Sequence, residues 1–468
     1  MTKHRSHPTS GDVTPSRRAF LATCAGTATA LSSGLFVPKS FAEEVKPMIR
    51  DYFVWDDESV IEFAESVLAK CVFDKIHPPQ GELKRRWNSP GGWYRGQWLW
   101  DTMFVVDLLS IFDGQKEVIR DVFGNYSDFQ ERWNAVKPDY MHDMIPCMIE
   151  AGDTTRRWET FPAYSQIPIL AWGLEQVYNR NQDRKLVQDN LVPVEKFHEW
   201  YWRERDVTNI GMIAVGAYNA GRQGFDIAQH ARWETFDYDR TLDHLKLTPH
   251  PTRKDDPPKD MYGDILVVGN TSYLIMAERS LARLARIVGD EAMAQRREKR
   301  LNKAVEAMRK HMWDEENGVF KALKRDSLEK INDLSIGCWI PLIAGVPTKE
   351  MAKRMMEVWA TPAWQTPLPV PTIPSNDPQY TPDRFWRGDV WTVTNYQIAA
   401  GIKAYGYDDF AASLADATIG NSMKNGVSEY HNSQTGAPLG VGYLGMSCTV
   451  VTMMLEGFSK KYRLELKK

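Results

Sequence analysis

Two acidic residues with aromatic neighbours are the leading candidates for chemistry in this chain of 468 residues. Asp226 follows Phe225, and Glu429 precedes Tyr430. A pair of carboxyl groups can cleave a glycosidic bond, because one protonates the leaving oxygen while the other activates water or attacks directly. Aromatic neighbours exclude water and so raise the pKa of the acid, which keeps it protonated near neutral pH.

Two tryptophan-rich segments contain the residue types that bind sugars. Residues 385–391 read Phe-Trp-Arg-Gly-Asp-Val-Trp, and residues 92–102 contain Asp101 among several tryptophans. An indole stacks on the apolar face of a sugar ring, and an arginine such as Arg387 donates hydrogen bonds to hydroxyls in a fixed fork. Together with the two acids, these segments supply the groups that cleavage of a glycosidic bond needs.

Each of these residues also has a structural interpretation. Asp226 could cap a helix, and Glu429 could pair with a surface lysine such as Lys424. Asp101 could be a helix cap or a buried hydrogen-bond hub. Arg387 could be a structural arginine that is stacked between core tryptophans. The residue types alone leave these alternatives open.

Composition and charge exclude several classes of function. The formal net charge of -3 argues against an electrostatic nucleic-acid surface. A chain that is 43% hydrophobic and 11% aromatic is globular. The histidines form no H-E-x-x-H or other close ligand spacing, so we expect no catalytic metal. There is also no P-loop, nucleophile elbow or dinucleotide-binding motif, and we expect no cofactor.

The N-terminal segment has the features of an export signal. Residues 16–21 read Ser-Arg-Arg-Ala-Phe-Leu, the form of a twin-arginine signal, and residues 40–42 offer a small-x-small cleavage site. We therefore expect residues 1–42 to be a signal peptide and the mature protein to be periplasmic or secreted. No other stretch approaches the length of a membrane span. The remaining cysteines are too widely separated for a disulfide framework or a zinc site: Cys71, Cys147, Cys338 and Cys448.

From about residue 45 onward, apolar residues recur at helical spacing. Residues 61–72 and 164–178 show this pattern, and residues 278–312 predict two helices that are separated near Gly289. The repeated order of helix, tight turn with a short extended piece, and helix is typical of helical hairpins arranged in a ring. Long strand-like alternation is absent from the sequence.

Two long segments rich in proline and aspartate interrupt the helical pattern. They cover residues 246–261 and 361–384. Loops of this length within a compact domain are usually functional, and the second leads directly into the Trp-Arg-Gly segment. No linker poor in apolar residues divides the chain, so we predict a single domain over residues 43–468.

Four blocks of sequence occur in an order that is specific to one group of enzymes. Residues 98–102 read Trp-Leu-Trp-Asp-Thr, and residues 340–345 read Ile-Pro-Leu-Ile-Ala-Gly. Residues 375–391 run from Ser-Asn-Asp-Pro to the Trp-Arg-Gly segment, and residues 429–436 read Glu-Tyr-His-Asn-Ser-Gln-Thr-Gly. Together these blocks resemble the trehalase-like glycosidases, glycoside hydrolase families 37 and 63, over roughly residues 93–445.

The resemblance implies an all-α fold, an (α/α)6 barrel or six-hairpin toroid with short β pieces in its loops. It also implies cleavage of an α-glycosidic bond with inversion, with Asp226 as general acid and Glu429 as general base. Their carboxyl groups would lie roughly 6.5–9.5 Å apart, which leaves room for the attacking water. Arg387 would hold sugar hydroxyls in the −1 subsite. The other residues implied in substrate binding are Trp98, Trp100, Asp101, Arg232, Trp386, Asp389 and Trp391.

The block around the expected acid departs from the family pattern E-S-G-x-D-x-S-x-R-[WF]. Residues 222–233 read Arg-Gln-Gly-Phe-Asp-Ile-Ala-Gln-His-Ala-Arg-Trp. The leading glutamate is missing, and Arg232 stands two residues further from Asp226 than in the pattern. Glu234 and Asp237 are therefore reserve candidates for the acid.

Asp389 and Thr392 replace both prolines of the family's Trp-Arg-Gly block. The substrate therefore cannot be inherited from trehalases or glucosidases, and we expect specificity to diverge at Asp389. Another (α/α)6 activity is an alternative: an unsaturated-uronide hydrolase, a lyase or an epimerase. A catalytically degenerate glycan-binding protein is a further one. We expect a carbohydrate as partner, no nucleic acid, and no stable membrane insertion once the signal is removed.

Overall fold

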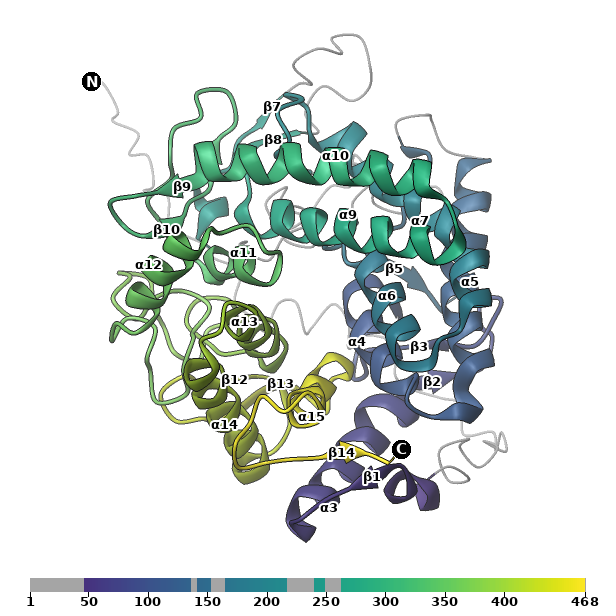
Figure 1. Ribbon diagram of the computed structural model, residues 1–468. Helices are drawn as coiled ribbons and strands as arrows, with labels where there is room; N and C mark the ends of the chain where they lie inside the picture. Colours follow the sequence, from purple (N-terminus) through teal and green to yellow (C-terminus); the bar gives the residue numbers. More distant parts are fainter. Residues whose placement is uncertain (1–45, 136–140, 153–164, 217–239, 249–261, 468) are drawn as a thin grey trace, which may run out of the picture. The chain divides into compact units, whose positions relative to one another are not determined.

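The computed structural model describes residues 46–135, 141–152, 165–216, 240–248 and 262–467 (Figure 1). The expected export signal at residues 1–42 lies outside these ranges. Helices that are almost entirely buried alternate along the chain with helices that bury only one stripe, and they form the inner and outer layers of an (α/α)6 barrel. No helix in the described ranges combines the length and the apolarity that crossing a membrane requires.

The inner layer is a closed ring of helices. Its members are α4 (Leu99–Leu109), α6 (Leu170–Asn181), α9 (Val268–Val288), α11 (Ile340–Ile343), α13 (Thr392–Ala404) and α15 (Thr449–Leu455). Each packs on the next, and the 3-10 helix η10 (Gly445–Cys448), which leads into α15, packs on α4 and closes the ring. Every residue of α4 is buried, as expected for a helix that has neighbours on all sides.

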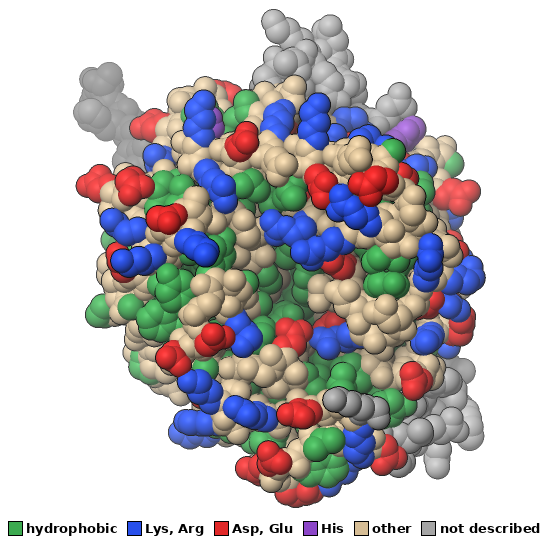
Figure 2. Space-filling model, in the orientation of Figure 1, with side chains coloured by type: hydrophobic (Ala, Val, Ile, Leu, Met, Phe, Trp, Pro, Cys, Tyr) green, Lys and Arg blue, Asp and Glu red, His purple; other side chains and the backbone are tan. Residues whose placement is uncertain are grey.

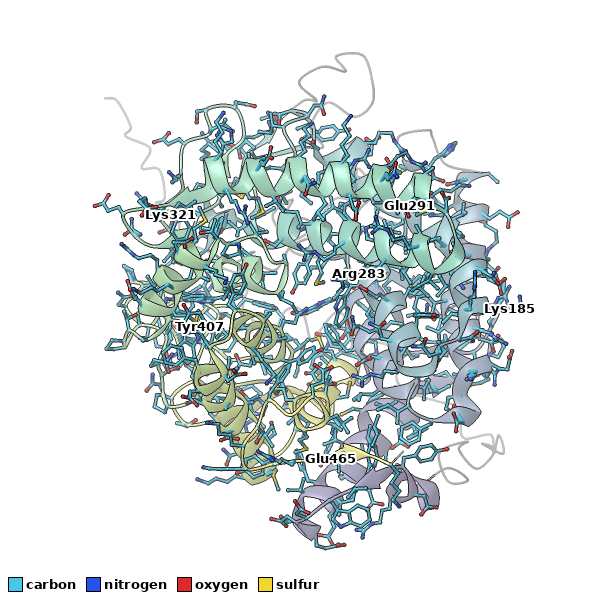
Figure 3. All side chains as sticks on the ribbon, in the orientation of Figure 1. Lys185, Arg283, Glu291, Lys321, Tyr407 and Glu465 are labelled. Carbon is cyan, nitrogen blue, oxygen red and sulfur yellow. The ribbon has the colours of Figure 1, made fainter. Side chains whose placement is uncertain are left out.

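The outer layer consists of amphipathic helices that each cover part of the ring. They are α3 (Glu58–Val67), α5 (Lys116–Asn134), α7 (Arg184–Arg205), α10 (Glu291–Ala307), α12 (Lys349–Trp359) and α14 (Asp408–Asn425). In Figure 1, α10 lies along α9 and α14 lies beside α13, and these pairs are in contact. Arg283, labelled in Figure 3, belongs to the inner helix α9 and donates to Glu175 of α6 at 3.1 Å.

The predicted break within residues 278–312 is confirmed. Helix α9 ends at Val288, and Gly289 follows it with a left-handed φ of 97°, which suits a glycine. The next residue, Asp290, caps α10, because its side chain accepts a hydrogen bond from the Met293 amide at 2.9 Å.

The helix predicted over residues 164–178 begins later, at Leu170 of α6. Pro168 explains the difference, because a proline disfavours helical backbone at the residue before it, here Ile167. The side chain of Gln166 instead accepts a hydrogen bond from the Trp100 amide of α4 at 2.9 Å. The extended segment thereby brings a polar side chain to the start of the neighbouring inner helix.

The strands are short and antiparallel, as the absence of long alternation predicts. One sheet contains β6 (Ala214–Gly216), β7 (Leu247–Thr248), β8 (Tyr262–Leu266) and β11 (Leu323–Lys324). The other pairs are β1 (Phe53–Val54) with β14 (Glu465–Leu466), β2 (Ile76–His77) with β3 (Trp87–Asn88), β4 (Gly96–Trp98) with β5 (Met148–Glu150), β9 (Trp313–Asp314) with β10 (Val319–Phe320), and β12 (Ser428–His431) with β13 (Pro438–Gly442). Strands β4, β8 and the β12–β13 pair lie in connections that lead into inner helices.

The connections that lead into the inner helices also contact one another. A β-bridge joins Val390, just before α13, to His431 of β12. Backbone hydrogen bonds of 2.8 Å join Ile336 to Thr372, Thr372 to Asp389, and Gly445 to Pro90. The segments that precede α4, α11, α13 and α15 are therefore collected at one end of the ring. Three of the sequence blocks lie on them: residues 92–102, 385–391 and 429–436.

Candidate active site

Glu429 of β12 is a buried carboxyl group whose two oxygens both accept hydrogen bonds. Its residue is 3% exposed. The Tyr94 hydroxyl donates to Oε1 at 2.6 Å, and the Val441 amide of β13 donates to Oε2 at 3.0 Å. Burial raises the pKa of Glu429, while these two hydrogen bonds oppose that rise. The carboxyl group is thus anchored from two sides, and these contacts replace the alternative pairing with Lys424.

Asp101 is a second buried carboxyl group, in the first turn of α4. Burial raises the pKa of Asp101 to about 7, and the charge of Glu429 contributes to this rise. A hydrogen bond with Gln166 opposes the shift. Asp101 is not the cap of α4, because Trp98 holds that position. The charge of Glu429 thus acts on the carboxyl group of Asp101.

A stack of aromatic rings lies beside Glu429. Trp386 is stacked on Trp391 with ring centroids 4.6 Å apart, and Trp391 is stacked on Tyr430 at 5.3 Å. Phe385 meets the edges of these rings. Since Tyr430 follows Glu429 on β12, the stack brings the Trp-Arg-Gly segment against the strand that carries the carboxyl group.

Trp98 and Trp100 lie at the start of α4, on the side of Tyr94 and Asp101. Trp98 is 9% exposed and meets Tyr94 edge to face at 5.3 Å. Trp100 is 5% exposed and meets Phe104 edge to face at 5.9 Å. Both tryptophans are mostly buried, so their main structural effect is to hold the first turn of α4 in place.

Asp389, which stands where the family pattern has a proline, supports the aromatic stack. Its residue is 0% exposed. Its carboxylate accepts hydrogen bonds from the Thr372 hydroxyl at 2.6 Å and from the indole N–H of Trp391 at 3.0 Å. An acid at this position therefore fixes the orientation of an indole, which a proline has no acceptor to do. The divergence of substrate specificity at Asp389 stays a prediction. Asp389 would affect specificity through the orientation of Trp391.

Arg387 is held by an acidic partner that the sequence did not indicate. Its Nη2 and Nη1 donate to the two carboxylate oxygens of Asp243 at 2.7 and 3.0 Å, and Nη1 also donates to Gln379 at 2.6 Å. Arg240 donates to Asp243 at 3.1 Å and to Asp377 at 2.8 Å. Burial raises the pKa of Asp243, but the two arginines outweigh it and hold that pKa below its usual value. These contacts differ from the interpretation of Arg387 as an arginine stacked between tryptophans.

Four expected residues lie outside the described ranges: Asp226, Arg232, Glu234 and Asp237. The described residues bring together Trp98, Asp101 and Glu429, and they place Trp386, Asp389 and Trp391 beside Tyr430. Tyr94 and Gln166 complete this site and were not predicted. Tyr94 belongs to the cluster at residues 92–102, but no local pattern indicates its partner. Within the part of the chain that the structure describes, no group of three or more His, Cys, Asp or Glu side chains is arranged to hold a metal ion.

On the face drawn in Figure 2, basic and acidic side chains are interspersed and form no separate patches. An interspersed pattern lacks the long-range attraction that a basic stripe exerts on a polyanion. This distribution agrees with the small net charge of the chain.

Comparison with known proteins identifies relatives along most of the chain. A family model described as the mannosylglycerate hydrolase MGH1-like glycoside hydrolase domain matches residues 94–448. The chain is 30% identical over 191 residues to a mannosylglycerate hydrolase of Rubrobacter radiotolerans, a match that covers 40% of this chain and 43% of that protein. It is 23% identical over 397 residues to a mannosylglycerate hydrolase of Thermus thermophilus, covering 74% of this chain and 90% of that protein.

The fold has a counterpart among solved structures. A GH63 mannosylglycerate hydrolase of Thermus thermophilus, in complex with glucose, is similar with a TM-score of 0.61 and 19% identity, covering 83% of this chain and 98% of that chain. At this identity, the likeness shows the fold alone. The predicted (α/α)6 fold and the resemblance to trehalase-like glycosidases of families 37 and 63 are confirmed.

The raised pKa of Asp101 makes a prediction about stability. A carboxyl group whose pKa is raised on folding binds its proton more tightly in the folded state, so the free energy of unfolding decreases as pH rises from about 4 to about 7. Asp101→Asn removes this effect and should gain about 4 kcal/mol relative to wild type at pH 8, but little at pH 4. Urea unfolding at both pH values measures the difference.

The exposed Asp113 provides the control, because Asp113→Asn should shift the free energy of unfolding equally at both pH values. If Asp101→Asn also gave the same shift at pH 4 and pH 8, the raised pKa of Asp101 would be refuted.

Proposed function

The chain belongs to the mannosylglycerate hydrolase MGH1-like family of glycoside hydrolases, and from this we propose that it cleaves an α-linked glycoside with inversion. Glu429 is the proposed general base, and Asp226 is the proposed general acid. The observation that carries this proposal is the buried carboxyl group of Glu429, oriented by Tyr94 and Val441 and flanked by an aromatic stack. A base that must deprotonate one water from a fixed direction requires such an orientation.

In the proposed reaction, Glu429 accepts a proton from water while the water oxygen bonds to the anomeric carbon. The bond from that carbon to the leaving oxygen breaks, and Asp226 donates a proton to the leaving oxygen. Attack from the face opposite the leaving group inverts the anomeric configuration. The hydrogen bonds to Glu429 favour its charged form and so oppose the effect of burial, which keeps the base ionised at a lower pH than burial alone would allow.

The names of the relatives suggest where a search for the substrate should begin. Two matching proteins are named mannosylglycerate hydrolases, so mannosylglycerate heads the panel of α-linked glycosides, followed by trehalose and glucosides of small acids. The panel is needed because Asp389 changes the support of Trp391, and Arg387 is held by Asp243. Both contacts involve the segment that the resemblance assigns to the −1 sugar.

We expect both proposed carboxyl groups to be essential for turnover. Glu429→Gln and Asp226→Asn should each lower kcat by about 100-fold or more, because each removes one proton-transfer group while keeping its shape. Initial rates on the best glycoside of the panel measure this, and circular dichroism verifies the fold. Glu291→Gln, on the exposed start of α10, is the matched control and should keep its rate. Near-wild-type rates for both carboxyl variants would disprove the mechanism.

Tyr94 should set the pH at which the base works. Its hydrogen bond lowers the pKa of Glu429, so Tyr94→Phe raises that pKa. The base must be ionised, and activity is lost as pH falls through its pKa. The acid limb of kcat/KM therefore moves to higher pH. A pH–rate profile measures the shift. Tyr178→Phe, on α6, should leave the limb in place. A limb that stays in place or moves to lower pH in Tyr94→Phe would contradict this role.

We also propose that the protein is exported by the twin-arginine route, on the pattern Ser-Arg-Arg-Ala-Phe-Leu at residues 16–21. Replacing Arg17 and Arg18 together by lysine should retain the full-length protein in the cytoplasm, because the export machinery reads the arginine pair. Cell fractionation with an immunoblot compares the variant with wild type. Equal amounts of processed protein in the periplasm or medium would refute this route.

A further inference from the structure

Trp93 differs from the other tryptophans near the site because its side chain is largely exposed. It is 68% exposed, whereas Trp98 is 9% and Trp391 is 2% exposed. A single exposed apolar residue is common on protein surfaces and needs no explanation by itself. The argument for a role therefore depends on how the backbone of Trp93 is held and on which residues it contacts.

The turn that carries Trp93 is fixed against the hairpin that supports Glu429. The Tyr94 amide donates to the Gly91 carbonyl at 3.1 Å, and the two glycines before Trp93 have left-handed φ values of 108° and 59°. A Cβ on Gly92 would lie 2.8 Å from the methyl groups of Val441, so the turn packs tightly on β13. The backbone of this turn is therefore held in place before a ligand binds, which reduces the entropy cost of binding.

An aromatic path leads from Trp93 to the proposed base. The rings of Trp93 and Tyr94 are 5.7 Å apart with a tilt of 35°. The Tyr94 hydroxyl then donates to Glu429 at 2.6 Å. Trp93 thus lies at the solvent end of a path whose buried end is the carboxyl group of Glu429.

We propose that Trp93 is an outer binding platform on which a ring of the substrate, beyond the sugar that is cleaved, stacks. This inference rests on the proposed glycosidase function and adds a substrate class to it. An exposed indole on a fixed backbone turn suits the apolar face of a pyranose or an aryl ring. Glycerate has no ring, so the preferred substrate of this chain carries a larger leaving group than mannosylglycerate does.

The test compares two glycosides of the same α-linked sugar, one with a methyl and one with a nitrophenyl leaving group. Trp93→Ala should raise KM for the nitrophenyl glycoside about 5- to 10-fold more than for the methyl glycoside, because only the former loses a stacking partner. Trp93→Phe should recover most of this difference. Val192→Ala, at an exposed apolar residue of α7, is the matched control and should give no difference between the two glycosides.

Equal effects of Trp93→Ala on both glycosides, or no effect on either, would overturn the platform while leaving the hydrolase proposal intact. If the wild-type protein cleaves neither glycoside, calorimetric titration of the nitrophenyl glycoside decides the question. Binding that weakens about 5-fold or more in Trp93→Ala supports the platform even though hydrolysis fails. Binding that is absent, or that Trp93→Ala leaves unchanged, overturns it.

Discussion

A carboxyl group can be buried without a large cost only if hydrogen-bond donors meet its oxygens, and the site is organised around this requirement at Glu429. Its two donors, Tyr94 and Val441, come from the connections before α4 and before α15. These are the first and last inner helices of the ring. Since Glu429 itself lies before α15, the Tyr94 bond also joins the two ends of the barrel, and the geometry of the site depends on ring closure.

The same requirement applies to two further acidic side chains, which accept hydrogen bonds from the Trp-Arg-Gly segment. Asp389 accepts from the indole of Trp391 and so fixes a ring of the stack beside Tyr430. Asp243 accepts from Arg387 and ties this segment to residues 240–244. In both cases an acidic side chain orients a neighbour that a sugar would contact. The departure from the family pattern at Asp389 thus alters support for the site, where small shifts can change substrate preference.

Local patterns predicted the fold better than the contacts of the site. The break at Gly289 was predictable because a left-handed cap and a capping aspartate are signals between adjacent residues. Pro168 carried the signal for the late start of α6, which helical spacing alone overlooked. The pairing of Glu429 with Tyr94 spans 335 residues, so no spacing in the sequence could indicate it. The order of the blocks predicted which segments meet, but only the packed ring determines which side chains bond.

The central claim is that Glu429 directs water to one face of an α-linked sugar. Proton NMR of the first product, recorded before mutarotation, tests this most directly. Inverting hydrolysis predicts that the β-anomer of the free sugar appears first, because water attacks the face opposite the leaving group. Release of the α-anomer, or a signal from an unsaturated sugar, would contradict the account.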